Sequence, residues 1–194
     1  CKNTKESIII DPGGEAEKII SQLKEFGCKV QSILHTHAHF DHCLATYDVS
    51  KFILMDQSEL TIGMHADDIP LYQQLPLQCQ MFNLPPSYPN ATINHFLEDN
   101  ELVTFGEHSL NIIHTPGHTL GSCSFNLENN GILFSGDTLF QRSIGRTDLP
   151  GGNKDDILKS IKTRLFTLDQ DTKVIPGHGP FTRIYEEKKE NPFF

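Results

Sequence analysis

The sequence predicts an α/β protein in which two mixed β-sheets lie face to face with helices on the outside. Strands and helices alternate at the start of the chain, the second half is rich in short strands, and a helix accompanies each strand-rich part. A length of 194 residues with 37% hydrophobic residues suits one domain with a buried core. We therefore expect a single domain over residues 1–194.

The first elements form a strand–helix–strand pattern. An apolar strand at 7–10 ends in the turn Asp11-Pro-Gly-Gly. A helix at 15–26 follows, and Gly27 stops it. Its apolar residues recur on one face: Ala16, Ile19, Ile20, Leu23 and Phe26. A strand at 28–34 comes next, and a short helix is predicted to begin near Asp41.

The middle of the chain has a weaker pattern. Residues 56–82 are predicted to be helical but irregular, with Pro70 and Pro76 interrupting them, and 83–90 is predicted to be a loop. Strands then follow at 92–96, 102–105, 109–115, 122–127 and 132–135. Gly106 and Asn129-Asn130-Gly131 indicate hairpin turns.

The last predicted elements are a helix and a strand. The helix spans 155–166, with Asn153 as its cap and Asp155 and Asp156 in its first turn. A final strand is expected at 172–175.

Composition excludes several classes of protein. The net charge of −9 argues against a nucleic-acid partner, because phosphate binding needs a basic surface. No apolar run approaches the roughly 20 residues of a membrane span, and nothing resembles a signal peptide. The five cysteines contain no C-x-x-C pair, which favours reduced thiols and a cytoplasmic location. Because the first residue is Cys1, we expect natural N-terminal strands to be missing.

The stretch LHTHAHFDHC at 34–43 points to metal chemistry. Histidine offers little packing advantage, but its neutral ring binds metal ions. His37 and His39 are two apart, so in an extended segment they point to the same side, while Asp41 and His42 diverge. The cluster follows a strand, where functional loops of layered folds tend to lie.

Three later stretches repeat this placement of a His or Asp in a tight turn after a strand. They are HTPGHT (114–119), SGDTLF (135–140) and PGHGP (176–180). The candidate ligands are five histidines and two aspartates: His37, His39, His42, His118, His178, Asp41 and Asp137. Such a set suits two divalent ions if one carboxylate bridges them and water completes the coordination.

These motifs resemble those of the metallo-β-lactamase superfamily. THAHFDH is similar to its T-H-x-H-x-D-H motif, and TPGHT, GDTLF and PGHGP follow in the expected order. SIGRTDLPGG and the tail from PGHGP to NPFF resemble glyoxalase II-like hydrolases (hydroxyacylglutathione hydrolase-like, YcbL type) over nearly the whole chain. The resemblance implies an αββα sandwich with a metal site at one edge of the two sheets.

The resemblance also implies a role for each ligand. His37, His39 and His118 hold one metal ion, Asp41, His42 and His178 hold a second, and Asp137 bridges them. Zinc is the first choice of metal, with iron or manganese as alternatives. A hydroxide held by both ions would attack a small thioester such as S-D-lactoylglutathione, with Asp41 orienting it. The net positive charge of such a centre favours an anionic substrate.

Glutathione recognition is expected to differ from that of full glyoxalase II enzymes. Arg146 falls near their glutathione-binding lysine and is predicted to bind a substrate carboxylate. Asp148 falls near their tyrosine and is predicted to pair with Arg146 or Arg142. We expect no C-terminal helical glutathione-binding domain, and either a monomer or a simple homodimer.

Other histidines are discounted as ligands. His35 is expected to fill a strand position and His114 to be a strand residue or a neighbour of the ligands. His65, His95 and His108 are expected in turns or on the surface.

Several alternatives remain at this stage. A glutathione persulfide dioxygenase shares HxHxDH and GRTD but uses a single iron, and a hydrolase of another small ester or lactone would use the same ligands. A common zinc β-lactamase would carry cysteine near Asp137, and an RNA-processing relative would need a basic surface. A non-enzymatic metal-binding module would close its coordination with protein ligands, whereas a shared Asp137 leaves room for water.

Overall fold

The computed structural model describes residues 1–84 and 90–194, which form two compact units. Unit 1 comprises Cys1–Phe96 and Phe105–His108, and unit 2 comprises Leu97–Thr104 and Ser109–Phe194. The expectation of a single domain stays a prediction. Most of the predicted loop at 83–90 lies outside the described residues. No described helix is long and apolar enough to cross a membrane.

Unit 1 is built on a four-stranded sheet, sheet A, with the order β1-β2-β3-β4. Its strands are β1 (Glu6–Ile10), β2 (Lys29–Leu34), β3 (Thr61–His65) and β4 (His95–Leu97). β2 pairs in parallel with both β1 and β3, so the carboxyl ends of these three strands lie at one edge. The predicted strands at 7–10 and 28–34 are confirmed, and the one at 92–96 begins later than predicted.

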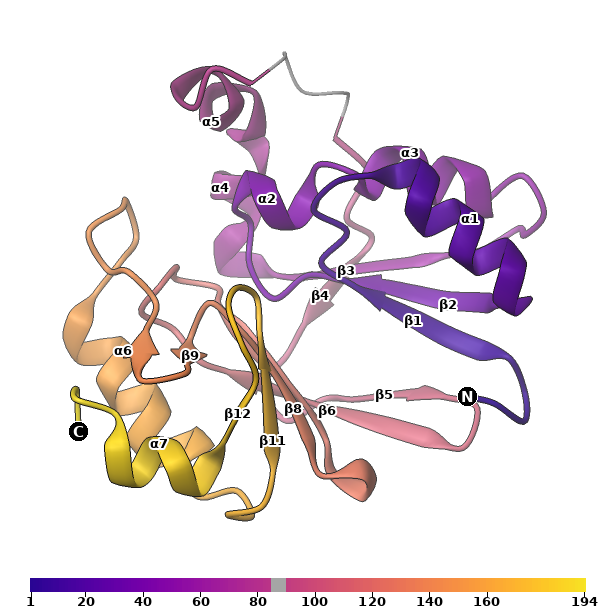
Figure 1. The fold of residues 1–194 in the computed structure, drawn as a ribbon. Coiled ribbons are helices and arrows are strands. Elements are labelled where there is room, and N and C mark those ends of the chain that lie inside the picture. Colours follow the sequence, from indigo (N-terminus) through magenta and orange to yellow (C-terminus); the bar gives the residue numbers. More distant parts are fainter. Residues whose placement is uncertain (85–89) are drawn as a thin grey trace. The chain divides into compact units, whose positions relative to one another are not determined.

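Two helices cover one face of sheet A, α1 (Ala16–Phe26) and α3 (Thr46–Ile53) (Figure 1). Ile19 and Leu23 of α1 pack on a cluster that includes Val30 of β2 and Val49 of α3. This packing confirms the apolar face that the sequence predicts for the first helix. Gly27 ends α1, as predicted.

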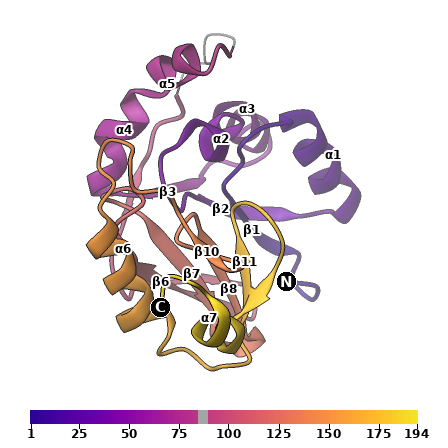
Figure 2. The same cartoon turned by 60° about the vertical axis from the view of Figure 1, so that its left-hand side comes forward.

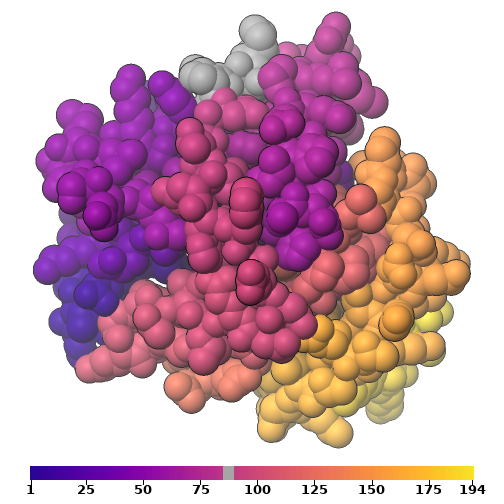
Figure 3. Space-filling view, turned by 180° about the vertical axis from the view of Figure 1, so that it is seen from behind, coloured from indigo at the N-terminus to yellow at the C-terminus, as the bar shows by residue number. Residues whose placement is uncertain are grey.

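The prediction of an irregular helix over 56–82 is wrong in part. Thr61–His65 forms β3, a strand whose three central residues are all buried, so it shows no alternation of apolar and polar residues. The helical part divides into α4 (Ile69–Gln73) and α5 (Leu75–Met81), whose outer surface is seen in Figure 3. Pro70 and Pro76 lie in the first turns of these helices, because a proline there removes no helical hydrogen bond. They begin helices instead of interrupting one.

Unit 2 is built on a mixed six-stranded sheet, sheet B, with the order β12-β11-β8-β7-β6-β5. Its strands are β5 (Leu102–Phe105), β6 (His108–His114), β7 (Cys123–Leu127), β8 (Ile132–Gly136), β11 (Lys173–Pro176) and β12 (Thr182–Arg183). β7 pairs antiparallel with β6 and β8, whereas β8 and β11 are parallel. The predicted strands at 102–105, 109–115, 122–127, 132–135 and 172–175 are therefore confirmed to within a residue.

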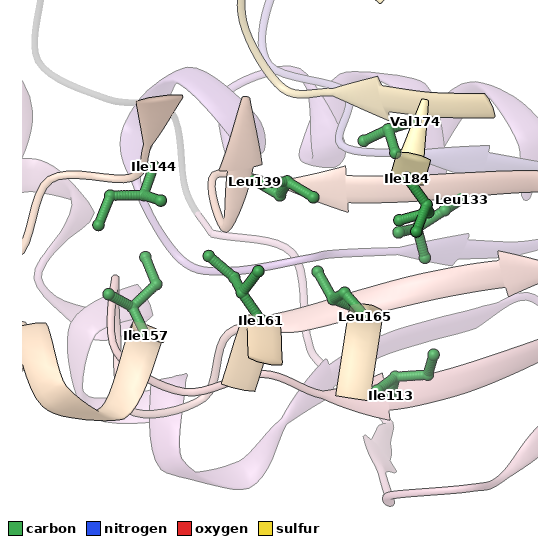
Figure 4. Close-up of a cluster of buried hydrophobic side chains, with 9 residues drawn as sticks. All are labelled: Ile113, Leu133, Leu139, Ile144, Ile157, Ile161, Leu165, Val174 and Ile184. Carbon is green, nitrogen blue, oxygen red and sulfur yellow. The ribbon is translucent and has the colours of Figure 1, made fainter. Parts of the chain in front are cut away.

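One face of sheet B is covered by α6 (Lys154–Ser160) and α7 (Ile184–Glu190) (Figure 2). A π-helical turn, Ile161–Leu165, continues α6, and Asn153 caps its start by accepting from the amides of Asp155 and Asp156. Ile157, Ile161 and Leu165 point from this helix toward the strand residues of a buried cluster (Figure 4). The predicted helix at 155–166 and its cap are thus confirmed.

Four elements of unit 2 were missed by the sequence reasoning. They are β9 (Leu139–Phe140), β10 (Ser143–Ile144), β12 and α7. The three strands have only two residues each, which is too short for an alternating pattern. Helix α7 is dominated by charged residues, and only Ile184 and Glu187 of it are buried.

Candidate metal centre

In unit 1 the motif loop leaves the carboxyl end of β2 and runs directly into the short helix α2 (Phe40–Cys43). The ring of His37 lies 4.9 Å from that of His39 and 4.1 Å from that of His42, centre to centre. His37 and His42 are buried, while Asp41 is exposed on α2. The structure therefore brings the three predicted histidine ligands of this unit together.

Asp11, at the end of β1, holds this loop and was missed as a site residue. Its Oδ1 accepts from the amide of Thr36 at 2.7 Å, and its Oδ2 accepts from the Thr36 hydroxyl at 2.6 Å. The same Oδ2 lies 2.9 Å from Nδ1 of His42. The sequence signal was present in DPGG, but it was interpreted only as a turn.

The hydrogen bonds of Asp11 also set the histidine tautomers. The Thr36 hydroxyl gives its proton to Asp11, so it accepts from Nδ1 of His37 at 3.0 Å. His42 likewise donates from Nδ1 to the Asp11 carboxylate. Both rings then carry their lone pair on Nε2, the arrangement in which a histidine binds a metal while its other nitrogen donates to an acceptor.

Two further side chains hold the main chain of the loop. The buried carboxylate of Asp68 accepts from the amide of Ala38 at 2.9 Å. Gln78 on α5 accepts from the amide of Phe40 at 3.0 Å and donates to the carbonyl of Ala38 at 3.1 Å. The loop is thus fixed by side chains that lie 30 to 40 residues away in the sequence.

His35 is a buried core residue, in agreement with its exclusion as a ligand. Its Nε2 lies 3.2 Å from the Thr46 hydroxyl, and its Nδ1 lies 3.6 Å from Sγ of Cys43. Burial lowers the pKa of His35 to about 4, so its ring is neutral at pH 7. Burial also raises the pKa of the Cys43 thiol, which suits a small apolar residue instead of a nucleophile.

In unit 2 the three predicted ligands lie at one edge of sheet B because of the strand order. β6 and β8 are both antiparallel to β7, and β11 is parallel to β8, so all three strands end at the same edge. Pro176 pairs with Gly136, and the amide of Gly177 donates to the Gly136 carbonyl at 2.9 Å. His118, Asp137 and His178 follow these strand ends.

A single carboxylate oxygen lies between two histidine rings in unit 2. Oδ2 of Asp137 is 3.7 Å from Nε2 of His118 and 3.7 Å from Nε2 of His178. These separations exceed hydrogen-bond length, and they leave one oxygen facing two ring nitrogens. The arrangement suits a carboxylate that shares its charge between two cations.

The carbonyl of Arg146 sets the tautomer of His118. Nδ1 of His118 donates to this carbonyl at 2.8 Å, which places the ring's lone pair on Nε2, the nitrogen nearest Asp137. The backbone of Gly145 lies so close to that of Asp137 that a Cβ on Gly145 would be 1.8 Å from the Asp137 carbonyl oxygen. Glycine at 145 is therefore required by close packing of backbone on backbone.

The side chain of Arg146 is paired with Asp148, as the sequence predicted for Asp148. Nε and Nη2 of Arg146 donate to the two carboxylate oxygens, each at 2.8 Å. This hydrogen bonding lowers the pKa of Asp148 to about 2, so it is ionised at neutral pH. A substrate carboxylate that binds Arg146 must compete with Asp148 for the same donors.

The other discounted histidines lie at strand ends. His114 ends β6, and its Nε2 donates to the carbonyl of Leu120 at 2.9 Å, which agrees with the strand role expected. His65 ends β3, His95 begins β4 and His108 begins β6, and all three are half-buried. The expectation of turn or surface positions for these three is therefore only partly right.

The described donor sets fit divalent metal ions. Three of the predicted histidine ligands donate from Nδ1 to an oxygen, which is typical of ligating histidines and orients their Nε2 atoms. Imidazole nitrogens and carboxylate oxygens together suit zinc, iron or manganese. These features define the protein as a candidate metal-binding protein whose ligands are histidines and aspartates.

Comparison with protein families identifies the family. The model of the metallo-beta-lactamase superfamily matches residues 2–178, so the chain belongs to this superfamily and has its α/β fold. The chain is 36% identical over 189 residues to hydroxyacylglutathione hydrolase GloC of Haemophilus influenzae, covering 97% of this chain and 87% of the relative.

Two solved structures are similar over most of their length. BLEG-1 B3 metallo-beta-lactamase has a TM-score of 0.85 and 36% identity, over 98% of this chain and 90% of that one. TTHA1623 in a di-iron-bound form has a TM-score of 0.85 and 36% identity, over 95% and 88% of the two chains. Members of the superfamily thus bind metal ions with this fold.

Proposed function

We propose that this protein is a binuclear metal hydrolase that cleaves small anionic thioesters such as S-D-lactoylglutathione. The observation that carries the two-metal part is the Asp137 oxygen that lies 3.7 Å from both His118 and His178 in unit 2. The similarity to a hydroxyacylglutathione hydrolase over 97% of the chain supports the thioester part.

The proposed ligand sets follow the order of the motifs. His37, His39 and His118 would hold one ion, Asp41, His42 and His178 would hold the other, and Asp137 would serve both. Zinc is the metal we propose, while the di-iron form of TTHA1623 supports iron as the alternative. Two such ions lower the pKa of coordinated water and polarise a carbonyl oxygen when bound.

The chain's own residues supply orientation and charge. Asp11 and the Arg146 carbonyl fix the rings of His42 and His118, so that Nε2 of each ring is presented to a metal. Asp41, exposed on α2, would orient the attacking water. Arg146 would bind a substrate carboxylate when at least one of its two hydrogen bonds to Asp148 is broken.

A second candidate is β-lactam hydrolysis. The 36% identity and TM-score of 0.85 to BLEG-1 B3 metallo-beta-lactamase favour it. A β-lactam antibiotic and S-D-lactoylglutathione both present an activated acyl carbon and both carry a carboxylate, so one centre can serve either chemistry. Substrate recognition beside the metal ions separates the two candidates.

The test is steady-state turnover by zinc-loaded and chelator-treated protein side by side. Thioester cleavage of S-D-lactoylglutathione that depends on metal is the expected result. Faster turnover of a chromogenic β-lactam would favour the second candidate. If protein with two bound ions hydrolyses neither compound, the thioester proposal is wrong, and oxygen uptake with glutathione persulfide by iron-loaded protein then tests the dioxygenase.

A further inference from the structure

We propose that Glu187, a buried carboxylate on α7, is a positioning residue for His118. The inference rests on the proposed role of His118 as a metal ligand. Glu187 is fully buried, although Lys188, Lys189 and Glu190 of the same helix are exposed. Burial of a carboxylate is unfavourable unless several hydrogen-bond donors satisfy its oxygens.

Three donors from different segments meet at Glu187. Its Oε2 accepts from the amide of Arg142 at 2.8 Å and from Nδ2 of Asn191 at 2.8 Å. Its Oε1 accepts from the hydroxyl of Thr182 at 2.5 Å. Asn191 also donates to the carbonyl of Ser143 at 3.0 Å. Glu187 and Asn191 therefore hold the main chain of the turn between β9 and β10 at two successive residues.

The turn needs such support because of its backbone. Arg142 has φ of 53°, in the left-handed region that is unfavourable for a residue other than glycine. The Glu187 carboxylate stabilises this conformation by accepting the Arg142 amide. The pairing of Ser143 with Phe140 and of Ile144 with Leu139 then fixes the direction in which β10 leaves the turn.

The chain that leaves this turn reaches His118 within a few residues. Ile144 is packed in the core, and the amide of Gly145 donates to the carbonyl of Thr138 at 3.2 Å. The carbonyl of Arg146 then accepts from Nδ1 of His118 at 2.8 Å. The backbone between the turn and Arg146 is tightly packed, since Gly145 lies too close to the Asp137 backbone for a Cβ to fit. A shift of the turn is therefore transmitted to the acceptor that orients the His118 ring.

The test measures Co²⁺ binding, by chelator competition and by the visible absorption of the bound ion, well below the unfolding temperature. Glu187→Gln keeps the size of the side chain but cannot accept all three donors. We expect it to weaken Co²⁺ binding on the order of tenfold, as loss of an outer hydrogen-bond partner does, and to alter the absorption bands. If Glu187→Gln does not fold, Asn191→Ala replaces it, and a weakening in the same direction is expected because Asn191 donates to both Glu187 and the Ser143 carbonyl.

Glu190→Gln is the matched control. Glu190 lies on the same helix and pairs with the Arg142 guanidinium at the surface, without touching the turn's backbone. Its substitution should leave Co²⁺ affinity and spectrum unchanged. Wild-type binding by Glu187→Gln, or equal weakening by both variants, would overturn the inference.

His118→Ala serves as the reference for the underlying ligand assignment. If His118→Ala weakens binding while Glu187→Gln does not, only the positioning role fails. If His118→Ala itself binds Co²⁺ as the wild type does, the ligand assignment of the proposed function fails and this inference with it.

Discussion

The two units place their candidate ligands by different physical means. In unit 1 the histidines are neighbours in the sequence, and side chains from distant segments, Asp11, Asp68 and Gln78, hold the loop that carries them. In unit 2 the ligands are about 20 and 40 residues apart, and the order of the strands brings them together. A sequence motif alone therefore describes the first group, whereas only pairing within sheet B explains the second.

The difference also extends to the groups that orient the rings. In unit 1 the acceptor that orients the His42 ring is a side-chain carboxyl group, that of Asp11. In unit 2 it is a neutral backbone carbonyl, that of Arg146. Substitution can remove the first acceptor directly, but the second can only be displaced through the chain that carries it.

The largest expected effect comes from Asp137→Ala. Removing the oxygen that faces both His118 and His178 should lose both metal ions or nearly so. Activity should fall on the order of a thousandfold, since bound metal supplies several kcal/mol of transition-state stabilisation. Metal analysis of the purified variant checks this, and two ions per chain would contradict the shared role. Asp171→Ala, a change of an exposed aspartate in the same unit, is the control.

Asp11→Asn should produce the next largest effect, within unit 1. Asparagine keeps one acceptor oxygen, so Thr36 and His42 lose part of their hydrogen bonding. We expect about 10- to 100-fold weaker metal binding and a loss of roughly 1–3 kcal/mol in the free energy of unfolding. Metal titration and denaturant unfolding measure these two quantities. An unchanged metal affinity would show that the carboxylate does not act on the ligands, and Asp67→Asn on the surface is the matched control.

A pair of glycine substitutions compares the two units directly. A Cβ on Gly13 would lie 1.6 Å from the Asp41 carbonyl oxygen, and one on Gly145 would lie 1.8 Å from that of Asp137. Gly13→Ala and Gly145→Ala should each destabilise the protein by about 1–3 kcal/mol through overpacking against backbone. Gly14→Ala, where nothing lies within 4 Å, should leave thermal unfolding nearly unchanged. If both tight sites tolerate alanine as Gly14 does, close packing does not hold these loops.

The smallest expected effect on stability comes from Asp148→Asn. The Arg146–Asp148 pair is exposed and screened by solvent, so its loss should leave the free energy of unfolding nearly unchanged. Released from the pair, Arg146 should bind a substrate carboxylate more tightly and lower KM for an anionic thioester by about twofold to fivefold, which is within the energy of one such pair. Steady-state kinetics decides this. A KM that stays constant, or rises, would argue against substrate binding by Arg146, and Asp169→Asn is the control.

Much of the fold was predictable because its elements carry strong local patterns. The amphipathic pattern of 15–26 predicts α1, and the alternation of strands with glycine turns predicts most of sheet B. The strands β9, β10 and β12 were not predicted, since segments of two residues carry no period and depend on partners for their pairing. The strand β3 was missed because its three central residues are all buried and show no alternation. The helix α7 was missed because most of its residues are charged and only Ile184 and Glu187 are buried, so its sequence shows no apolar face.

The sequence by itself determined the candidate ligand types, because histidines and aspartates recur in tight turns after several of the predicted strands. Tertiary structure alone decided which groups hold those residues. Asp11 accepts from His42, the Arg146 carbonyl accepts from His118, and Glu187 accepts from the amide of Arg142 in the turn before β10. Each of these is a hydrogen bond between segments far apart in the chain. No local pattern encodes such a bond, since any carboxylate or carbonyl can accept one, and only packing determines which donor it meets.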